Sequence, residues 1–202
     1  LSVSMVATPF WLLPSPRRLE WLAKKAISTE DKPSDFAFLD PRLLRTPGVA
    51  VSECASMVNQ MGALAQASMN LVLDQFLQYT EAREEEILAN EDKLDIYEDR
   101  LGGYLVQISQ HGTSADDNHT ISRLLHAIGD FERIGDHILN LQQSAKELHD
   151  KQLRFSDAAR EELAVLTHLM QDILDASLSC FREDDPIAAQ QVEPLEETRD
   201  CL

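Results

Sequence analysis

The chain has 202 residues, enough to bury a hydrophobic core in one domain or slightly more. It carries 18 Lys and Arg against 35 Asp and Glu, a formal charge of −17 at pH 7. This balance argues against binding to nucleic acid, which needs basic patches, and favours cations, basic partners or simple solubility. Cys54, Cys180 and Cys201 show no zinc-binding spacing, which fits a reduced, cytoplasm-facing setting.

Residues 1–27 begin with the apolar run LSVSMVATPFWLL and continue with a basic cluster. An apolar run before the basic residues is the wrong order for a signal peptide, and residues 1–13 are too few to cross a bilayer, which needs about 20. We interpret residues 1–27 as the end of a truncated transmembrane region with a basic juxtamembrane segment on the cytoplasmic side. The alternative is an amphipathic helix lying on the domain or on a membrane surface.

The remainder of the chain has the periodicity of an all-α protein. Residues 28–46 are rich in Ser, Asp and Pro and are predicted to be a linker. Thr46 and Pro47 form a favourable helix start, with Thr as the N-cap and Pro at the first helical position. Apolar spacing and capping residues predict helices over about 47–79, 81–110, 117–150 and 157–182, and a fifth helix that opens at Asp185–Pro186.

The two halves of the chain contain an internal repeat. The segment EDKLDIYEDRL at 91–101 resembles EPLEETRDCL at 193–202. No counterpart of the predicted 117–150 helix follows the second copy. We therefore expect a first three-helix unit over residues 47–155 and an incomplete second unit over residues 156–202.

The segment DFERIGDHILN, residues 130–140, contains Glu132 and Asp136 one helical turn apart. On a helical projection, several apolar residues fall within about 40° of Glu132, namely Ile121, Leu125, Ile128 and Leu139. Carboxylates that face a core are paired, protonated or bound to a cation. Gly129 and Gly135 lie on or beside the same face and leave room for a close neighbour. The segment therefore predicts an acidic site inside a helical bundle.

A second acidic pair, Glu91 and Asp95, lies on the preceding helix, with Glu98 one turn further on. A short connection makes the two helices antiparallel neighbours, so the two pairs are expected to converge. Carboxylate oxygens suit Mg²⁺, Ca²⁺, Mn²⁺ or iron rather than a metal that prefers thiolates.

Two other interpretations of these acids remain open. Taken alone, Glu91, Asp95 and Glu98 are typical of a solvated or ion-paired helix face. Arg133 and His137 lie beside the acids of the 117–150 helix and are candidates to neutralise them. Enzyme motifs are absent from the sequence: no Glu has a His three residues later, as ferritin-like di-iron bundles require, and there is no P-loop, GxSxG or HExxH. We expect no catalytic activity.

Two segments carry a resemblance to a known family. LLHAIGDFERIGDHILNL, residues 124–141, resembles the signature helix of PhoU-type phosphate-uptake regulators, which are paired three-helix bundles with metal-binding E(D)xxxD motifs. LDPRLLRTPGVAV, residues 39–51, is similar to the segment that joins the membrane part of bacterial sodium/phosphate cotransporters to their C-terminal PhoU-like domain. Residues 1–25 fit the end of that membrane part.

The resemblance implies a PhoU-like up-down helical bundle, with one complete three-helix unit and a partial second one. It makes Glu91, Asp95, Glu132 and Asp136 the ligands of a divalent or iron-type metal ion, Mg, Mn or Fe. The implied function is that of a cytoplasmic regulatory or accessory domain of a sodium-dependent phosphate transporter at the bacterial inner membrane.

The expected partners are the membrane transporter domain of the same polypeptide and, through it, phosphate and sodium. A second copy of the chain is a further candidate partner, forming a homodimer. Two alternatives are a free-standing PhoU-type regulator of phosphate uptake and signalling, and a helical scaffold without metal.

Overall fold

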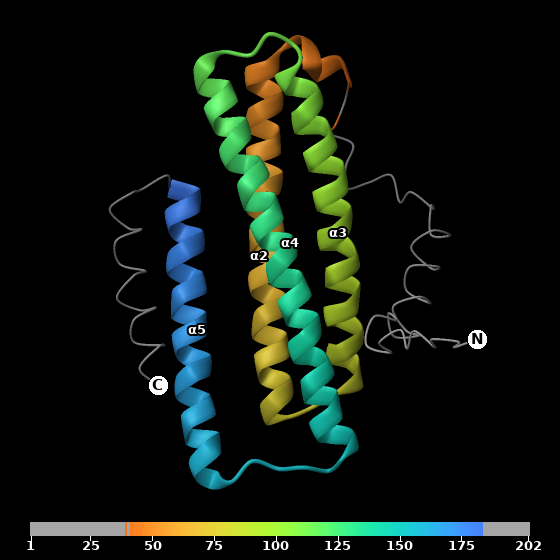
Figure 1. Ribbon diagram of the computed structural model, residues 1–202, viewed down its shortest axis with the longest axis vertical. Helices are drawn as coiled ribbons and strands as arrows, with labels where there is room; N and C mark the ends of the chain where they lie inside the picture. Colours follow the sequence, from red (N-terminus) through yellow and green to blue (C-terminus); the bar gives the residue numbers. More distant parts are fainter. Residues whose placement is uncertain (1–38, 40, 184–202) are drawn as a thin grey trace, which may run out of the picture. The chain divides into compact units, whose positions relative to one another are not determined.

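The computed structural model describes Leu39 and residues 41–183 (Figure 1). This part of the chain contains a short 3₁₀ helix and four α-helices and no strand, which confirms the predicted all-α class. The elements are η2 (Pro41–Arg45), α2 (Pro47–Leu77), α3 (Glu81–Ser109), α4 (Ala115–Asp150) and α5 (Asp157–Glu183). None of these helices combines the length and apolar composition that crossing a bilayer requires.

Several predictions fall beyond this part of the chain. The interpretation of residues 1–27, the helix expected at Asp185–Pro186 and the repeat copy at 193–202 lie outside the described residues. The last residues of the predicted linker form η2, so that helix directly precedes the bundle.

The starts of α2 and α3 follow the predicted capping chemistry in part. Pro47 occupies the first position of α2, as predicted, but the Thr46 hydroxyl does not cap that helix. Thr46 Oγ1 instead donates a hydrogen bond to the carbonyl oxygen of Leu43, at 3.3 Å. At the start of α3, the Thr80 hydroxyl accepts a hydrogen bond from the Arg83 amide at 3.4 Å. Side-chain capping therefore supports α3, and proline geometry supports α2.

The start of α4 lies two residues before the predicted position. Ser114 is the N-cap: its hydroxyl accepts a hydrogen bond from the Asp117 amide at 3.0 Å, and its own amide donates to Asp117 Oδ2 at 3.3 Å. This reciprocal pair is a capping box. The prediction placed the helix start at the acidic partner of the box instead of at its serine.

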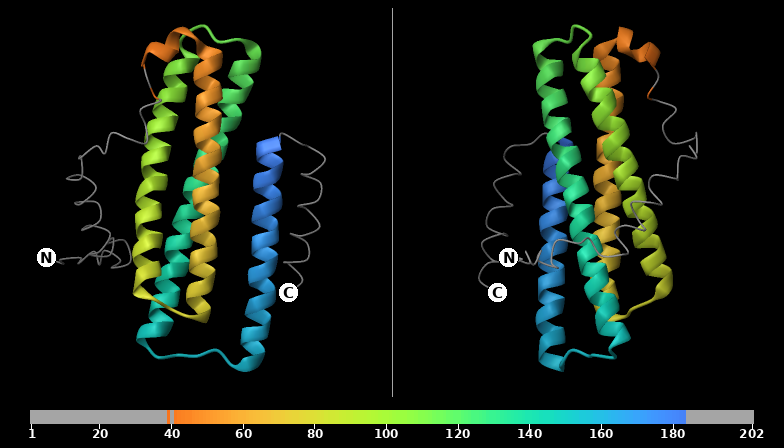
Figure 2. Two further views of the ribbon diagram at one scale, coloured as in Figure 1. Left: turned by 180° about the vertical axis from the view of Figure 1, so that it is seen from behind. Right: turned by 45° about the vertical axis from the view of Figure 1, so that its right-hand side comes forward.

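Helices α2, α3 and α4 form an up-down-up bundle in which each helix packs against the other two (Figures 1 and 2). The predicted adjacency of the second and third helices is confirmed. Apolar side chains at helical spacing fill the centre, and the largest fully buried ones are Met61, Ile87, Leu94, Leu101, Leu105, Ile108, Leu124 and Ile138. Removing this apolar surface from water supplies the main driving force for the bundle.

Helix α5 runs beside α2, outside the three-helix bundle (Figure 2). The Phe181 ring packs edge-on against the Phe131 ring of α4, with ring centroids 5.9 Å apart. Gln171 Nε2 donates a hydrogen bond to Asn70 Oδ1 at 3.1 Å. Met170 and Leu174 are half-buried against the apolar cluster of the bundle. Helix α5 is thus attached through a single face and a few polar contacts.

The turn between α2 and α3 is held by the buried Gln75 side chain. Its Oε1 accepts a hydrogen bond from the Thr80 amide at 2.8 Å, and its Nε2 donates to the Thr80 carbonyl at 3.0 Å. Gln75 Nε2 also approaches Gln142 Oε1 of α4 at 3.3 Å. One amide therefore ties together the ends of three helices, in an interior where unpaired polar groups are costly.

Candidate acidic site

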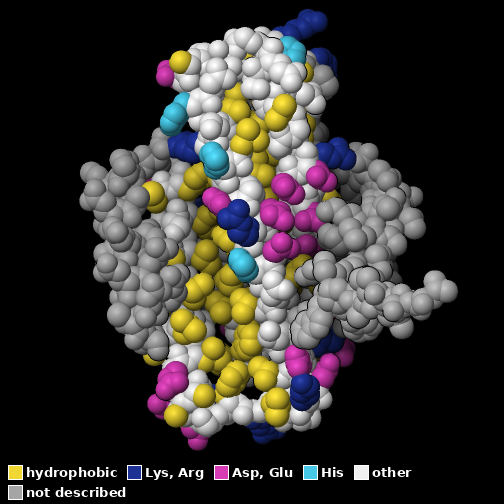
Figure 3. All heavy atoms as spheres, in the orientation of Figure 1, with side chains coloured by type: hydrophobic (Ala, Val, Ile, Leu, Met, Phe, Trp, Pro, Cys, Tyr) yellow, Lys and Arg dark blue, Asp and Glu magenta, His cyan; other side chains and the backbone are white. Residues whose placement is uncertain are grey.

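The predicted site acids lie along the contact between α3 and α4. On α3, Glu91 is buried and Asp95 is half-buried. On α4, Glu132 is half-buried and Asp136 is exposed. Figure 3 shows acidic side chains gathered at this level of the bundle, on the face where α3 and α4 meet.

The core face of α4 lies slightly to one side of the predicted one. The buried α4 residues are Ile121, Leu124, Ile128, Phe131, Gly135, Ile138, Gln142 and Ala145. Leu125 and Leu139, which the projection placed in the core beside Glu132, are only half-buried. The prediction therefore set Glu132 too near the centre of the core: it lies at the edge, where a carboxylate keeps partial access to water.

A close approach of the two helices sets the spacing of the acids. Gly135 is buried, and a Cβ atom at this position would lie 3.1 Å from Leu94 Cδ1. A side chain at residue 135 would therefore require the Leu94 side chain to move by a few tenths of an ångström. Leu94 precedes Asp95 and Gly135 precedes Asp136, so the same contact brings the two acids onto neighbouring helix faces. Gly129 has no atom within 4 Å of such a Cβ, so the predicted close neighbour exists at Gly135 alone.

The electrostatics of Glu132 show which acids the fold brings together. Its pKa is raised above the ordinary value, first by burial and then by the negative charges of Asp136, Glu98 and Asp95. The positive charge of Arg133 opposes this shift and is the smallest of the causes. Four carboxylates from two helices therefore share one region, and their mutual repulsion is only partly offset.

Glu98, which the sequence placed one turn beyond the predicted pair on α3, is one of the carboxylates that raise the pKa of Glu132. The sequence signal for Glu98 was its spacing, because a residue three positions after Asp95 falls on the same side of α3. Glu91 lies one turn earlier and is 6% exposed, which makes it the most buried acid of the predicted set.

The nearby Arg133 and His137 side chains neutralise little of the negative charge of the acids. Arg133 Nη1 lies 3.8 Å from Asp130 Oδ1, and both side chains are about 70% exposed. An exposed pair of this kind contributes little to stability. His137 is also exposed. Neutralisation by these two residues, the alternative considered from the sequence, is therefore limited to the small effect of Arg133 on Glu132.

The donor set is composed of carboxylate oxygens, which fit a hard cation such as Mg²⁺ or Mn²⁺. Within residues 41–183, no three Asp, Glu, His or Cys side chains are grouped closely enough to hold one ion. The acids thus share an electrostatic environment without forming a closed coordination shell. The assignment of Glu91, Asp95, Glu132 and Asp136 as metal ligands stays a prediction.

The described part of the chain thus contains a three-helix bundle with acids gathered across two of its helices. Comparison with protein families identifies this bundle more closely. Residues 58–145, a little less than half of the chain, match the PhoU domain. This region, from within α2 to within α4, is similar to the PhoU domain. No curated protein and no solved structure gives a significant match to the chain.

Proposed function

We propose that the chain is the cytoplasmic regulatory domain of a sodium-dependent phosphate transporter. The observation that carries this proposal is the PhoU-domain match, which spans parts of all three bundle helices. The link to a transporter is supported by the resemblance of residues 39–51 to the segment that joins such transporters to their PhoU-like domain. In this proposal the partner is the membrane domain of the same polypeptide, and phosphate and sodium are handled by that domain.

The regulatory signal in this proposal is occupancy of the acidic site by a divalent or iron-type cation. The proposed ligands are Glu91, Asp95, Glu132 and Asp136. The described side chains are not grouped closely enough to hold one ion, so binding would have to draw these acids together. A bound cation supplies positive charge where carboxylates now repel one another. Because it would bind the folded bundle and not the unfolded chain, it would stabilise the contact between α3 and α4 by mass action.

The packing of α4 offers a route from this site to α5. Glu132 directly follows Phe131, whose ring contacts Phe181 of α5. A shift of α4 at the acidic site would therefore change the contact of α5 with α4, while α5 stays packed mainly against α2. Cation occupancy would then select between two positions of α5, and the membrane partner would respond to that difference.

Thermal unfolding with and without Mn²⁺ or Mg²⁺, against a chelator reference, tests the cation site. At a concentration about 100 times its Kd, the ion should raise the Tm of the parent by about 5–10 °C. The double variant Glu132→Gln, Asp136→Asn should lose this rise. The matched control Glu85→Gln, Glu86→Gln removes two exposed acids of α3 and should keep it.

Two results would contradict the cation site. A double variant that responds like the parent would show that Glu132 and Asp136 are not ligands. A parent whose Tm is the same in the metal ion and in chelator would favour the metal-free scaffold.

The transporter assignment has its own test. Fractionation of the full natural gene product, without detergent, should leave it in the membrane pellet. Recovery in the supernatant would favour the free-standing regulator, whatever the outcome of the metal experiment.

A further inference from the structure

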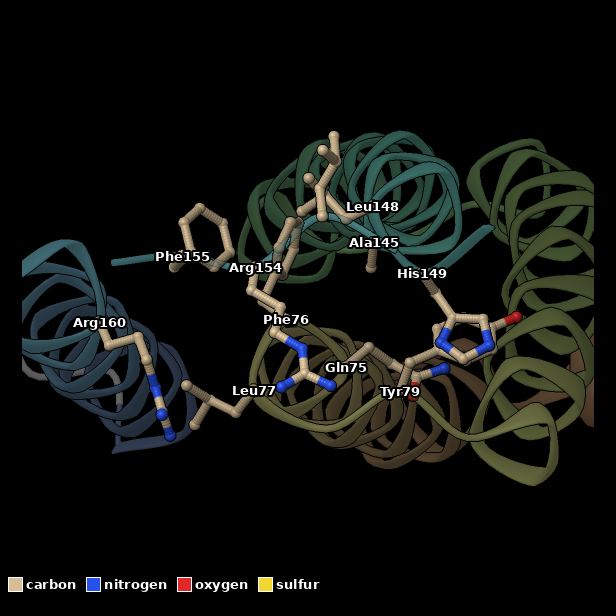
Figure 4. A pocket seen from close by; sticks show the side chains of 11 residues that line it. Gln75, Phe76, Leu77, Tyr79, Ala145, Leu148, His149, Arg154, Phe155 and Arg160 are labelled. Atoms are coloured by element: carbon tan, nitrogen blue, oxygen red, sulfur yellow. The ribbon is translucent and has the colours of Figure 1, made fainter. Parts of the chain in front are cut away.

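A pocket of about 360 Å³ lies at the end of the bundle where α2 and α4 finish and α5 begins (Figure 4). Its volume is at the lower end of the range typical of small-molecule sites, about 300–1,000 Å³. The pocket is remote in sequence from the acids between α3 and α4, and the proposed function does not use it.

Much of the pocket wall is apolar and open to water. Leu77, Leu153 and Phe155 line it and are 48%, 57% and 37% exposed. Phe76 and Leu148 add further apolar surface. Large apolar side chains that gather around a hollow, and remain exposed there, are typical of a surface that binds an apolar group.

The end of α4 holds part of this wall in place. Gln152 adopts a left-handed conformation, with φ 55°, directly after the helix. Its amide donates to the His149 carbonyl at 3.0 Å, and the Leu153 amide donates to the Leu148 carbonyl at 3.0 Å. These two bonds form a Schellman motif, which usually brings the two apolar residues at its ends together. Leu148 and Leu153 both line the pocket, so its floor is organised before any ligand arrives.

The stacked rings of Tyr79 and His149 form one end of the pocket. The rings of Tyr79 and His149 are stacked, with centroids 4.3 Å apart and an interplanar angle of 19°. In Figure 4 these rings lie at one end of the pocket, Phe155 and Arg160 lie at the other, and Arg154 lies between them. The two arginines thus lie toward the middle and the far end of the pocket, away from the stacked rings.

Two arginines in one pocket lining are unusual for a chain with a formal charge of −17. Arg154 and Arg160 both line the pocket, and neither forms a salt bridge with a carboxylate of the described residues. A guanidinium group presents a planar set of donors that matches carboxylate and phosphate oxygens. Two such groups beside an apolar wall are complementary to an anion attached to an apolar body.

We propose that this pocket binds a small organic anion, a phosphate or carboxylate group carried on an apolar chain or ring. Arg154 and Arg160 take the anionic group, and Leu153, Phe155 and the stacked rings cover the apolar body. Inorganic phosphate alone would leave the apolar wall in water and most of the volume unfilled. The chemistry therefore favours an anionic amphiphile over the free ion.

Calorimetric titration of the full chain tests the proposal, with octyl phosphate as the probe below its micelle-forming concentration. We expect one molecule to bind per chain, and binding should shift the NMR signals of the backbone amides of residues 148–160. The variant Arg154→Gln, Arg160→Gln should weaken binding about tenfold, since two charge-assisted contacts are lost. Phe155→Ser should weaken it about fivefold through loss of apolar contact.

The controls separate charge, apolar contact and location. Arg45→Gln, Arg133→Gln removes the same charge from exposed positions elsewhere and should bind like the parent. Inorganic phosphate should bind at least about tenfold more weakly than octyl phosphate, and octyltrimethylammonium should not compete. All the substituted side chains are exposed, so the variants should fold like the parent.

Several outcomes would overturn the proposal. They are equal affinity in the Arg154→Gln, Arg160→Gln variant, equal affinity for inorganic phosphate, or amide shifts confined to residues outside 75–79 and 145–160. Binding to anionic vesicles without any binding of monomeric octyl phosphate would also overturn it, because that result assigns the surface to a membrane. So would binding of an acidic peptide alone, which assigns the surface to a protein partner.

Discussion

The three-helix bundle and α5 use apolar surface differently, although α3 and α5 are of similar length. Helices α3 and α4 bury eight residues each, whereas α5 buries four. The bundle has its largest fully buried residues on α2, α3 and α4, while Met170 and Leu174 of α5 are only half-buried against it. Local stability follows the density of buried apolar contacts, so the bundle is expected to be the cooperative unit and α5 the element that detaches first.

Truncating one leucine in each region should expose this difference most strongly. Leu105 is fully buried, and Leu105→Ala should lower the free energy of unfolding by about 3–4 kcal/mol because it leaves a cavity. Leu174→Ala, at a half-buried position of α5, should cost about 1 kcal/mol, since the site already contacts water and can relax. Chemical denaturation measures both values. Equal losses would mean that α5 is part of the same core.

The packing of α4 and α5 against α2 can be tested by adding a side chain at the crowded position Gly62. A Cβ atom there would lie 2.8 Å from Phe131 Cζ and 2.9 Å from Leu178 Cδ2. Gly62→Val should therefore lower the unfolding free energy by about 2 kcal/mol through overpacking. Gly103→Val is the matched control: no atom lies within 4 Å of a Cβ at that position, so stability should stay the same or rise slightly. If both variants had the same stability, α5 would not rest on Gly62.

Removing side-chain hydrogen bonds should also cost more stability in the three-helix bundle than at α5. Gln75→Leu removes two hydrogen bonds to the Thr80 backbone and the link to Gln142, at an estimated cost of about 1.5 kcal/mol. Gln171→Leu removes the single bond from α5 to Asn70 and should cost less than about 0.5 kcal/mol. Thermal melts of the two variants give the comparison. A larger effect of Gln171→Leu would show that polar contacts, not apolar burial, fix α5.

The smallest expected effect is electrostatic and depends on pH. Because the pKa of Glu132 in the folded protein is raised, its ionised form destabilises the fold, and protonation relieves this. In chelator at pH 7, Glu132→Gln should therefore be more stable than the parent by a few tenths of a kcal/mol, about 0.5 at most, since the site is partly solvated. This stability gain of Glu132→Gln should shrink as the pH falls through the raised pKa of Glu132 in the folded protein. It should vanish below pH 4.5, the ordinary pKa of a glutamate, where the parent carboxyl is protonated in both states.

The matched control for this effect is Glu161→Gln, at an exposed position of α5. Urea unfolding at a series of pH values should show no comparable trend for it. A Glu132→Gln variant that is less stable than the parent at pH 7 would indicate that the carboxylate accepts hydrogen bonds that outweigh the repulsion.

Local features of the sequence were enough to predict the helices. The ends of α3 and α5 agree with the predicted ranges to within a residue or two, and Pro47 begins α2 as expected. These features are set by neighbours a few positions apart, through capping, proline geometry and apolar spacing. The proximity of the two acidic helices was also predictable, because a short connection leaves them few alternatives to antiparallel packing.

The exact membership of the acidic group was not predictable in this way. A helical projection assumes that the core faces the mean direction of the apolar residues, but α4 is rotated toward Phe131 and Gly135 because it packs against two partners. That rotation moves Glu132 to the edge of the core. The same packing places Glu98 and Asp95 of α3 where their charges raise the pKa of Glu132.

The sequence by itself determined which segments are helical, where most of them begin and end, and which face of the bundle is acidic, because these properties depend on residues within one or two turns of each other. Only the tertiary structure decided which carboxylates meet, how loosely α5 is held, and that the ends of three helices enclose a pocket with two arginines. Those features join residues as far apart in the sequence as Asn70 and Gln171, and depend on how whole helices rotate and approach one another.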